Sequence, residues 1–113
     1  EVSGGMRPGM NMRKPVAEEN EGFFLEQAKA FKAALSIPVA TVNGWRSLSR
    51  MRATLDSGAA DMISLCRPLI REPGLVARFA AGLQERAGCT SCNQCLKRQE
   101  ALRCWDLAAP AGS

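Results

Sequence analysis

Hydrophobic positions along the chain follow two patterns, short apolar runs and longer stretches with a helical period. The short runs are Val39-Ala40-Thr41-Val42 and Met62-Ile63-Ser64-Leu65. The first run carries β-branched residues on both faces, which is typical of a strand covered from both sides. Pro38 cannot continue a preceding helix, so we expect the first strand to begin at Ile37-Pro38.

Three other stretches place apolar residues on one helical face. They cover about residues 19–35 (Phe24, Ala28, Phe31, Leu35), 47–57 (Leu48, Met51, Leu55) and 73–87 (Leu75, Phe79, Leu83). We expect Ser47 or Ser49 to cap the second helix and Gly58 to end it in a left-handed conformation. Gly88 is expected to end the third.

These elements predict an α/β fold with parallel strands. The segment Glu1-Val2-Ser3-Gly4-Gly5 resembles the end of a further strand, so strands and helices alternate along the chain. Three such units are too few to close an eight-stranded barrel and would leave sheet edges open. We therefore expect the chain to be part of a larger fold or to need a partner. The loop at residues 4–21 carries Arg7, Arg13 and Lys14, which we expect to be solvated.

Composition narrows the classes of function. The 113 residues suffice for one domain at most, and the chain contains neither histidine nor tyrosine. Their absence removes histidine acid–base chemistry and a tyrosine proton donor. The net charge of +4 is spread along the chain, so we expect no nucleic acid as partner. No apolar run approaches the ~20 residues that a membrane span needs, so we expect no membrane segment. The odd number of five cysteines favours a reducing, cytoplasmic setting.

Each predicted strand ends in a small basic turn. The first turn is Asn43-Gly44-Trp45-Arg46-Ser47, and the second begins with Cys66-Arg67-Pro68. Consecutive parallel strands bring their exits side by side, where backbone N–H groups and an arginine can hold a phosphate. The alternative is a pair of ordinary surface turns. The Trp45 side chain is either core cover or a contact of a cofactor edge, and we expect the Cys66 side chain to be packed.

Four of the cysteines crowd the C-terminal end. Cys89, Cys92 and Cys95 are spaced C-x2-C-x2-C, and Cys104 follows nine residues later. The first three match part of a ferredoxin-type iron–sulfur run. Zinc binding and free or redox-active thiols remain alternatives.

Several segments together resemble a known family. In chain order, the segments are 1–5, 14–16, 24–29, 37–39, 42–47, 58–61, 64–70 and the cysteine run 89–95. From Glu1 to about Cys104, they resemble the C-terminal part of the Old Yellow Enzyme family. More narrowly, they are similar to the branch of NADH:flavin oxidoreductases and 2,4-dienoyl-CoA reductases.

The resemblance implies a partial TIM barrel that binds FMN. Residues 1–88 would hold strands six to eight, about three C-terminal βα units, and residues 89–113 would form a Cys-rich tail. The FMN phosphate positions would be Asn43, Gly44, Trp45, Cys66 and Arg67. Cys66 stands where the family has Gly or Ala, so its side chain must point away from the phosphate.

The reductase branch also carries a 4Fe–4S cluster, whose ligands here would be Cys89, Cys92, Cys95 and Cys104. The third cysteine comes one residue early and the fourth sooner than in cluster enzymes. The parent enzyme would pass hydride from NAD(P)H through flavin to an activated alkene or a similar small-molecule acceptor.

The resemblance assigns no catalytic residue to this chain, because the family's His/Asn pair and Tyr donor lie earlier in the barrel. We therefore expect no turnover from the chain alone. Its expected partner is the remainder of the barrel or a second copy. The alternative is a non-catalytic module that binds metal or docks to a partner.

Overall fold

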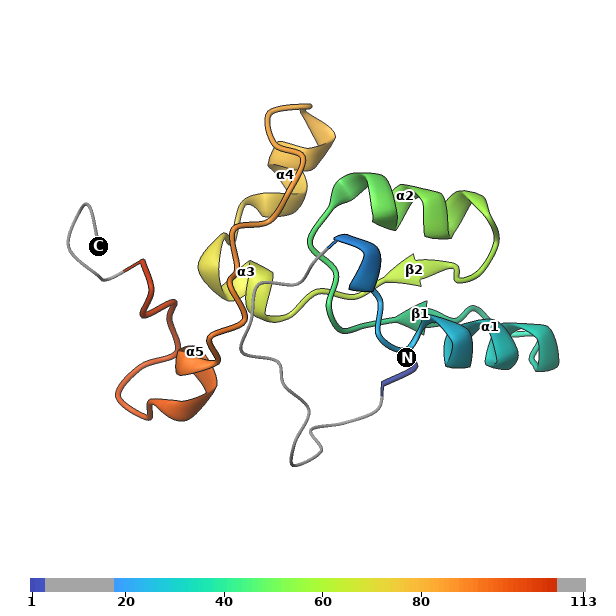
Figure 1. The fold of residues 1–113 in the computed structure, drawn as a ribbon, viewed down its shortest axis with the longest axis horizontal. Helices are drawn as coiled ribbons and strands as arrows, with labels where there is room; N and C mark the ends of the chain where they lie inside the picture. Colours follow the sequence, from blue (N-terminus) through green and yellow to red (C-terminus); the bar gives the residue numbers. More distant parts are fainter. Residues whose placement is uncertain (4–17, 108–113) are drawn as a thin grey trace.

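The computed structural model describes residues 1–3 and 18–107 (Figure 1). Within these residues the elements are, in order, η1 (Glu18–Asn20), α1 (Leu25–Ala34), β1 (Ala40–Thr41), α2 (Leu48–Asp56), β2 (Met62–Ile63), α3 (Arg67–Arg71), α4 (Leu75–Ala80) and α5 (Gln94–Lys97). Figure 1 shows the two strands near α1 and α2, with α5 at the opposite end of the molecule.

The sheet is parallel, as the sequence pattern predicts. Ala40 pairs with Met62 and Thr41 with Ile63. On the other side of β1, Val2 forms a parallel bridge to Thr41, and its N–H donates to the carbonyl of Ala40 at 2.8 Å. Three parallel segments therefore lie in the order Val2, β1, β2. Closure into a barrel by further strands stays a prediction.

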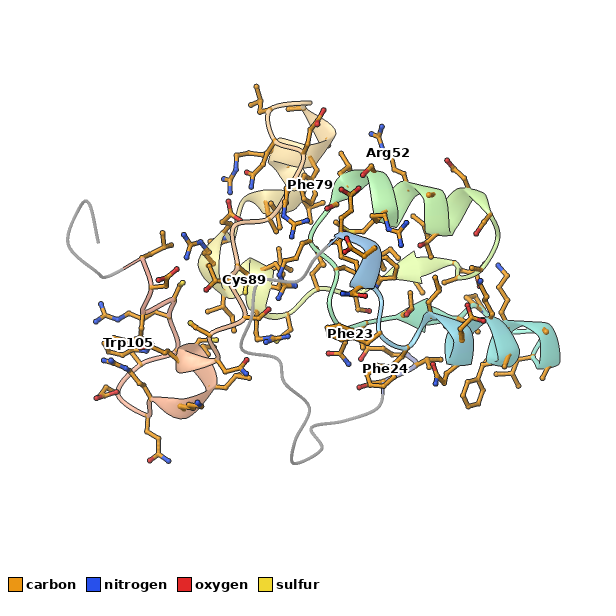
Figure 2. All side chains as sticks on the ribbon, viewed as in Figure 1. Phe23, Phe24, Arg52, Phe79, Cys89 and Trp105 are labelled. Atoms are coloured by element: carbon orange, nitrogen blue, oxygen red, sulfur yellow. The ribbon has the colours of Figure 1, made fainter. Side chains whose placement is uncertain are left out.

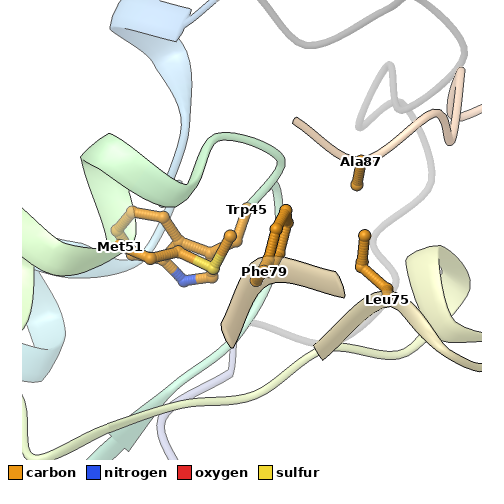
Figure 3. Close-up of a cluster of buried hydrophobic side chains, with 5 residues drawn as sticks. All are labelled: Trp45, Met51, Leu75, Phe79 and Ala87. Carbon is orange, nitrogen blue, oxygen red and sulfur yellow. The ribbon is translucent and has the colours of Figure 1, made fainter. Parts of the chain in front are cut away.

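The hydrophobic core lies beside the strands, where α2 and α4 approach the first exit turn. It consists of Trp45, Met51, Leu75, Phe79 and Ala87 (Figure 3). The Trp45 indole is its largest member and is 1% exposed. Apolar burial of this size contributes on the order of 2 kcal/mol for each large side chain.

The predicted helix over 19–35 begins later than its pattern indicated. Gly22 has φ +73°, and a Cβ there would approach a Trp45 ring carbon to 2.5 Å. This turn separates η1 from α1. On the predicted apolar face, Ala28 is buried, whereas Phe31 and Leu35 are exposed. An apolar helix face without cover is what a larger fold would leave in one of its parts.

The predicted helix over 73–87 was wrong in length. α4 ends at Ala80, and Gly82 with φ +72° follows its C-terminal end in place of Gly88. Leu83, expected on the buried face, is 76% exposed. Beyond Gly82 the backbone pairs with the first exit turn: Leu48 N–H donates to Glu85 O at 2.9 Å and Ala87 N–H to Arg46 O at 2.8 Å. These tertiary hydrogen bonds replace the helical ones. The short helices α3 and α5 were not predicted.

No helix within residues 1–3 and 18–107 is long and apolar enough to cross a membrane.

Candidate functional site

The two strand exits form one narrow pocket. Its walls are the segments 42–46 and 64–68, which include all five residues predicted to bind phosphate. Parallel pairing of β1 with β2 brings these segments together, as expected for consecutive strands.

The first exit turn has a backbone that favours glycine. Asn43 and Gly44 have φ +86° and +82°. A Cβ on Gly44 would lie 2.9 Å from Cε2 of Phe23, so the turn leaves no room for a side chain there. Ser47, predicted as one of two possible caps, is the N-cap residue of α2, but its hydroxyl accepts from Arg86 at 2.6 Å rather than from the helix. Gly58 has the predicted left-handed conformation.

A buried carboxylate holds the same turn. The Glu21 side chain has no exposed surface, and its Oε1 accepts the backbone N–H groups of both Arg46 and Ser47. Its Oε2 lies 3.9 Å from Nη1 of Arg86. The turn is therefore fixed from outside the pocket, by a residue 25 positions earlier in the chain than Arg46.

The pocket offers hydrogen-bond donors to a ligand. Among the described residues, the backbone N–H groups of Gly44, Trp45 and Cys66 donate to no other group of the chain. Unpaired N–H groups that converge from two turns are a common feature of phosphate sites. An anion with several oxygens therefore suits this pocket.

The side chains of Trp45 and Cys66 take different places from one another. Trp45 packs in the core, so only its backbone is available to the pocket. The expectation that the Cys66 side chain is packed was wrong, because Cys66 is exposed. An exposed thiol at this exit is free to point away from a ligand held by the backbone.

Arg46 faces the C-terminal tail. Its Nε donates to the carbonyl of Cys89 at 3.0 Å, its Nη1 to the carbonyl of Trp45 at 2.7 Å, and its Nη2 to Oγ of Ser91 at 2.7 Å. Nη2 also lies 3.5 Å from Sγ of Cys89. Burial lowers the pKa of Arg46, and the nearby Cys89 raises it. Arg46 is 2% exposed, and its hydrogen bonds join the exit turn to the tail.

Arg67 and Arg71, at the two ends of α3, reach the same tail. Nη1 of Arg67 donates to Oδ1 of Asn93 at 2.5 Å. Nη1 of Arg71 lies 3.6 Å from Sγ of Cys104 and 2.6 Å from Oδ2 of Asp106. Burial works against the charge of Arg71, but its bonds to Asp106 and Cys104 raise its pKa overall.

The four tail cysteines line one cavity, to which Arg67 also contributes. In Figure 2, Cys89 lies near α3, and Trp105 lies further along the tail. Burial raises the pKa of the Cys95 thiol, as does the charge of Cys89, while the charge of Arg67 lowers it. All five cysteines are free thiols, and no group of three or more metal-ligating residues within the described part of the chain is arranged to hold an ion.

Two kinds of metal centre take cysteine ligands of this number. A single zinc ion needs its thiolates to converge on one point. In a 4Fe–4S cluster each thiolate binds a different iron, so the four sulfurs surround a volume. Cys89, Cys92, Cys95 and Cys104 are among the residues that line one cavity. Trp105 also lines it, and its buried Nε1 has no partner in the described residues. Four cysteines are a ligand set that both a structural zinc site and a 4Fe–4S cluster use.

Some predicted residues lie outside the described part. The basic residues Arg7, Arg13 and Lys14 belong to residues 4–17, and the last six positions of the predicted tail are 108–113. The division into residues 1–88 and 89–113 stays a prediction.

Three residues of this region were not predicted: Glu21, Arg71 and Asn93. Asn93 has φ +64°, and it precedes α5 between two of the cysteines. An asparagine inside a cysteine run is a weak signal for such a left-handed turn. Glu21 and Arg71 act across 25 or more positions, so no local pattern identifies them.

Comparison with known proteins gives partial similarities. The chain is 33% identical over 82 residues to a 4,4'-dithiodibutanoate disulfide reductase from Rhodococcus erythropolis, which covers 73% of this chain and 20% of the reductase. It is 37% identical over 57 residues to the NADH-dependent flavin oxidoreductase iccE from Talaromyces variabilis, covering 50% of this chain and 14% of that protein. No protein-family model matches the chain.

The chain thus spans at most about a fifth of the length of these relatives. Over the shared part, it is similar to a flavin oxidoreductase-like family, and the relatives' names support a flavin-dependent oxidoreductase function in general terms.

Proposed function

We propose that this chain forms strands six to eight of a TIM-barrel oxidoreductase and supplies the phosphate end of its FMN site. The observation that carries the proposal is the pocket between the two strand exits. Its wall holds Arg67 and three backbone N–H groups that have no acceptor among the described residues. Similarity to a flavin oxidoreductase agrees with it.

The residues of the pocket have distinct roles in this proposal. The N–H groups of Gly44 and Cys66 and the guanidinium of Arg67 hold phosphate oxygens, and Asn43 shapes the turn. FMN, when bound, accepts a hydride from NAD(P)H and passes it to a small-molecule acceptor. Holding FMN by its phosphate orients the flavin but does not contact the substrate. The groups that contact the substrate therefore belong to the rest of the barrel.

A pair of flavins tests the phosphate contact. In the full-length polypeptide, Arg67→Ala should weaken FMN binding about 10- to 100-fold, because it removes a charge-assisted hydrogen bond. Riboflavin lacks the phosphate, so its affinity should not change. Isothermal titration or flavin-fluorescence quenching measures both.

Two control variants separate the causes. Asn93→Ala removes the tail contact of Arg67 but keeps its guanidinium, so FMN binding should persist. Arg50→Ala removes an exposed charge from α2 and should have no effect. Equal losses in Arg67→Ala and Asn93→Ala would assign the effect to the tail. A source gene that encodes no further barrel strands would refute the proposal outright.

The thiol cavity favours a second candidate function, a non-catalytic module that binds metal through Cys89, Cys92, Cys95 and Cys104. An iron–sulfur cluster there would supply one-electron transfer. Anaerobic purification, followed by iron, sulfide, zinc and flavin assays, distinguishes the candidates. Flavin favours the oxidoreductase, and metal without flavin favours the module.

A further inference from the structure

Two of the four tail cysteines have a guanidinium group beside their sulfur. Nη2 of Arg46 lies 3.5 Å from Sγ of Cys89, and Nη1 of Arg71 lies 3.6 Å from Sγ of Cys104. These are the first and last cysteines of the set. The arginines come from different elements, the first exit turn and the end of α3, and they meet the set at its two ends.

The Arg46 group is held in place independently of the sulfur. Three other acceptors fix its guanidinium: the carbonyls of Trp45 and Cys89 and the hydroxyl of Ser91. Ser91 is 1% exposed and has φ +61°, so the loop between the first two cysteines is shaped around this contact. The N–H that points at Cys89 is therefore preorganised.

The Arg71 group is also fixed by a second partner. Asp106 accepts from the same Nη1 at 2.6 Å, and its carboxylate keeps the guanidinium beside Cys104. The Arg71 side chain is 20% exposed, so this pair lies nearer the surface than the Arg46 contact.

A thiolate centre accumulates negative charge. Four thiolates around a divalent ion or a cluster leave a net negative centre, and N–H groups aimed at the sulfurs offset that charge and orient the ligands. Within the described residues, the charged side chains that contact a tail sulfur are those of Arg46 and Arg71.

We propose that Arg46 and Arg71 are positioning residues of a thiolate metal centre, orienting Cys89 and Cys104 as ligands and offsetting the charge of the loaded site. The inference rests on the metal-binding role proposed for the four cysteines. It is independent of the flavin phosphate site.

The test measures metal affinity in the full chain under anaerobic conditions. Cobalt(II) is the first probe, because its sulfur-to-metal charge-transfer band reports thiolate ligation. Reconstitution with iron(II) and sulfide is the second. Arg71→Gln should weaken loading about 10- to 100-fold, the usual cost of losing an outer contact of a metal ligand. Arg71→Lys keeps a charged donor and should restore most of it.

A matched control lies in the same tail. Arg103→Gln removes the same charge from a residue that stacks 3.8 Å from the centre of the Trp105 ring and contacts no cysteine sulfur in the described residues. It should leave the metal affinity unchanged. Arg46→Gln removes the charge at the second site, beside Cys89, and should also weaken loading. Circular dichroism with thermal melting shows whether that buried variant still folds.

Equal affinities in wild type, Arg71→Gln and a folded Arg46→Gln would overturn the proposal, as would equal losses in Arg71→Gln and Arg103→Gln. A chain that loads neither cobalt nor an iron–sulfur cluster also overturns it. In that case the FMN and riboflavin comparison still decides the flavin proposal.

Discussion

Replacing Glu21 with alanine should destabilise the fold more than any surface change of the same kind. The carboxylate is fully buried, accepts the N–H groups of Arg46 and Ser47, and lies 3.9 Å from the guanidinium of Arg86. Alanine leaves two buried N–H groups without an acceptor and removes the anionic partner of a cation. Both N–H groups belong to the exit turn, whose residues 43–46 form part of one wall of the phosphate pocket.

The size of the effect follows from these contacts. Each hydrogen bond to the charged Glu21 oxygen contributes about 1.5–3 kcal/mol. The pair with Arg86 adds little, because the Arg86 side chain is 44% exposed. The losses overlap, so we expect Glu21→Ala to lower the free energy of unfolding by about 3–5 kcal/mol. Glu21→Gln keeps an acceptor oxygen and loses only the charge, so it should cost roughly half as much.

Urea denaturation followed by tryptophan fluorescence measures both variants, because Trp45 lies in the core. Glu26→Ala is the control: its carboxylate is 82% exposed and pairs with Lys29 on the surface of α1, so its loss should stay within about 0.5 kcal/mol. If Glu21→Ala unfolds at the same urea concentration as Glu26→Ala, the carboxylate does not hold the turn and the reasoning fails.

Three further changes test other parts of the structure. Gly44→Ala should lower the free energy of unfolding by about 1–3 kcal/mol, because the new Cβ would lie 2.9 Å from Phe23 in a residue with positive φ. Gly58 has a similar φ and nothing within 4 Å of its Cβ position, so Gly58→Ala should lower the free energy of unfolding less in the same urea experiment. Burial raises the pKa of Glu72, but hydrogen bonds from three donors outweigh that effect and lower the pKa overall. The ionised Glu72 therefore stabilises the fold above about pH 4.3, and this stabilisation is lost as the pH falls through its folded-state pKa. Glu72→Gln should therefore flatten the acid side of a pH–stability curve, and an unchanged curve would contradict this. Cys66→Ser should remove one fast-reacting thiol equivalent in a thiol-reagent assay, since Cys66 is exposed while the other cysteines are partly buried; an unchanged fast phase would show that another thiol reacts first.

The strands and their pairing followed from the sequence because they depend on local composition. β-branched residues at 39–42 and a helical stretch between two apolar runs predict parallel strands, and Ala40 pairs with Met62 accordingly. Gly58 could be placed for a similar reason, since an αL cap depends on one residue at the end of one helix.

The end of the third helix could not be predicted in this way. Leu75, Phe79 and Leu83 have the correct helical spacing, but Glu85 and Ala87 form hydrogen bonds with the backbone around Arg46. Those partners are about 40 positions away, and local propensity carries no information about them.

The same limit applies to Arg46, which the spacing placed on a phosphate. Its acceptors Cys89 and Ser91 lie 43 and 45 positions later, and only the folded chain shows that the exit turn and the cysteine tail meet. Phosphate binding by Arg67 remains a prediction. Arg67 lies in the pocket wall, where the spacing of the strand exits placed it.

Counting donors separates the two arginines as phosphate ligands. A guanidinium has five N–H groups, and bidentate recognition of a phosphate needs two that point the same way. Within the described residues, Arg46 directs Nε, Nη1 and Nη2 to acceptors in the turn and the tail, so no free edge is left. Arg67 gives one Nη1 donor to Asn93, and the edge formed by Nε and Nη2 has no acceptor among those residues. Arg67 can therefore bind a phosphate and hold the tail at once, whereas Arg46 would have to release the tail first.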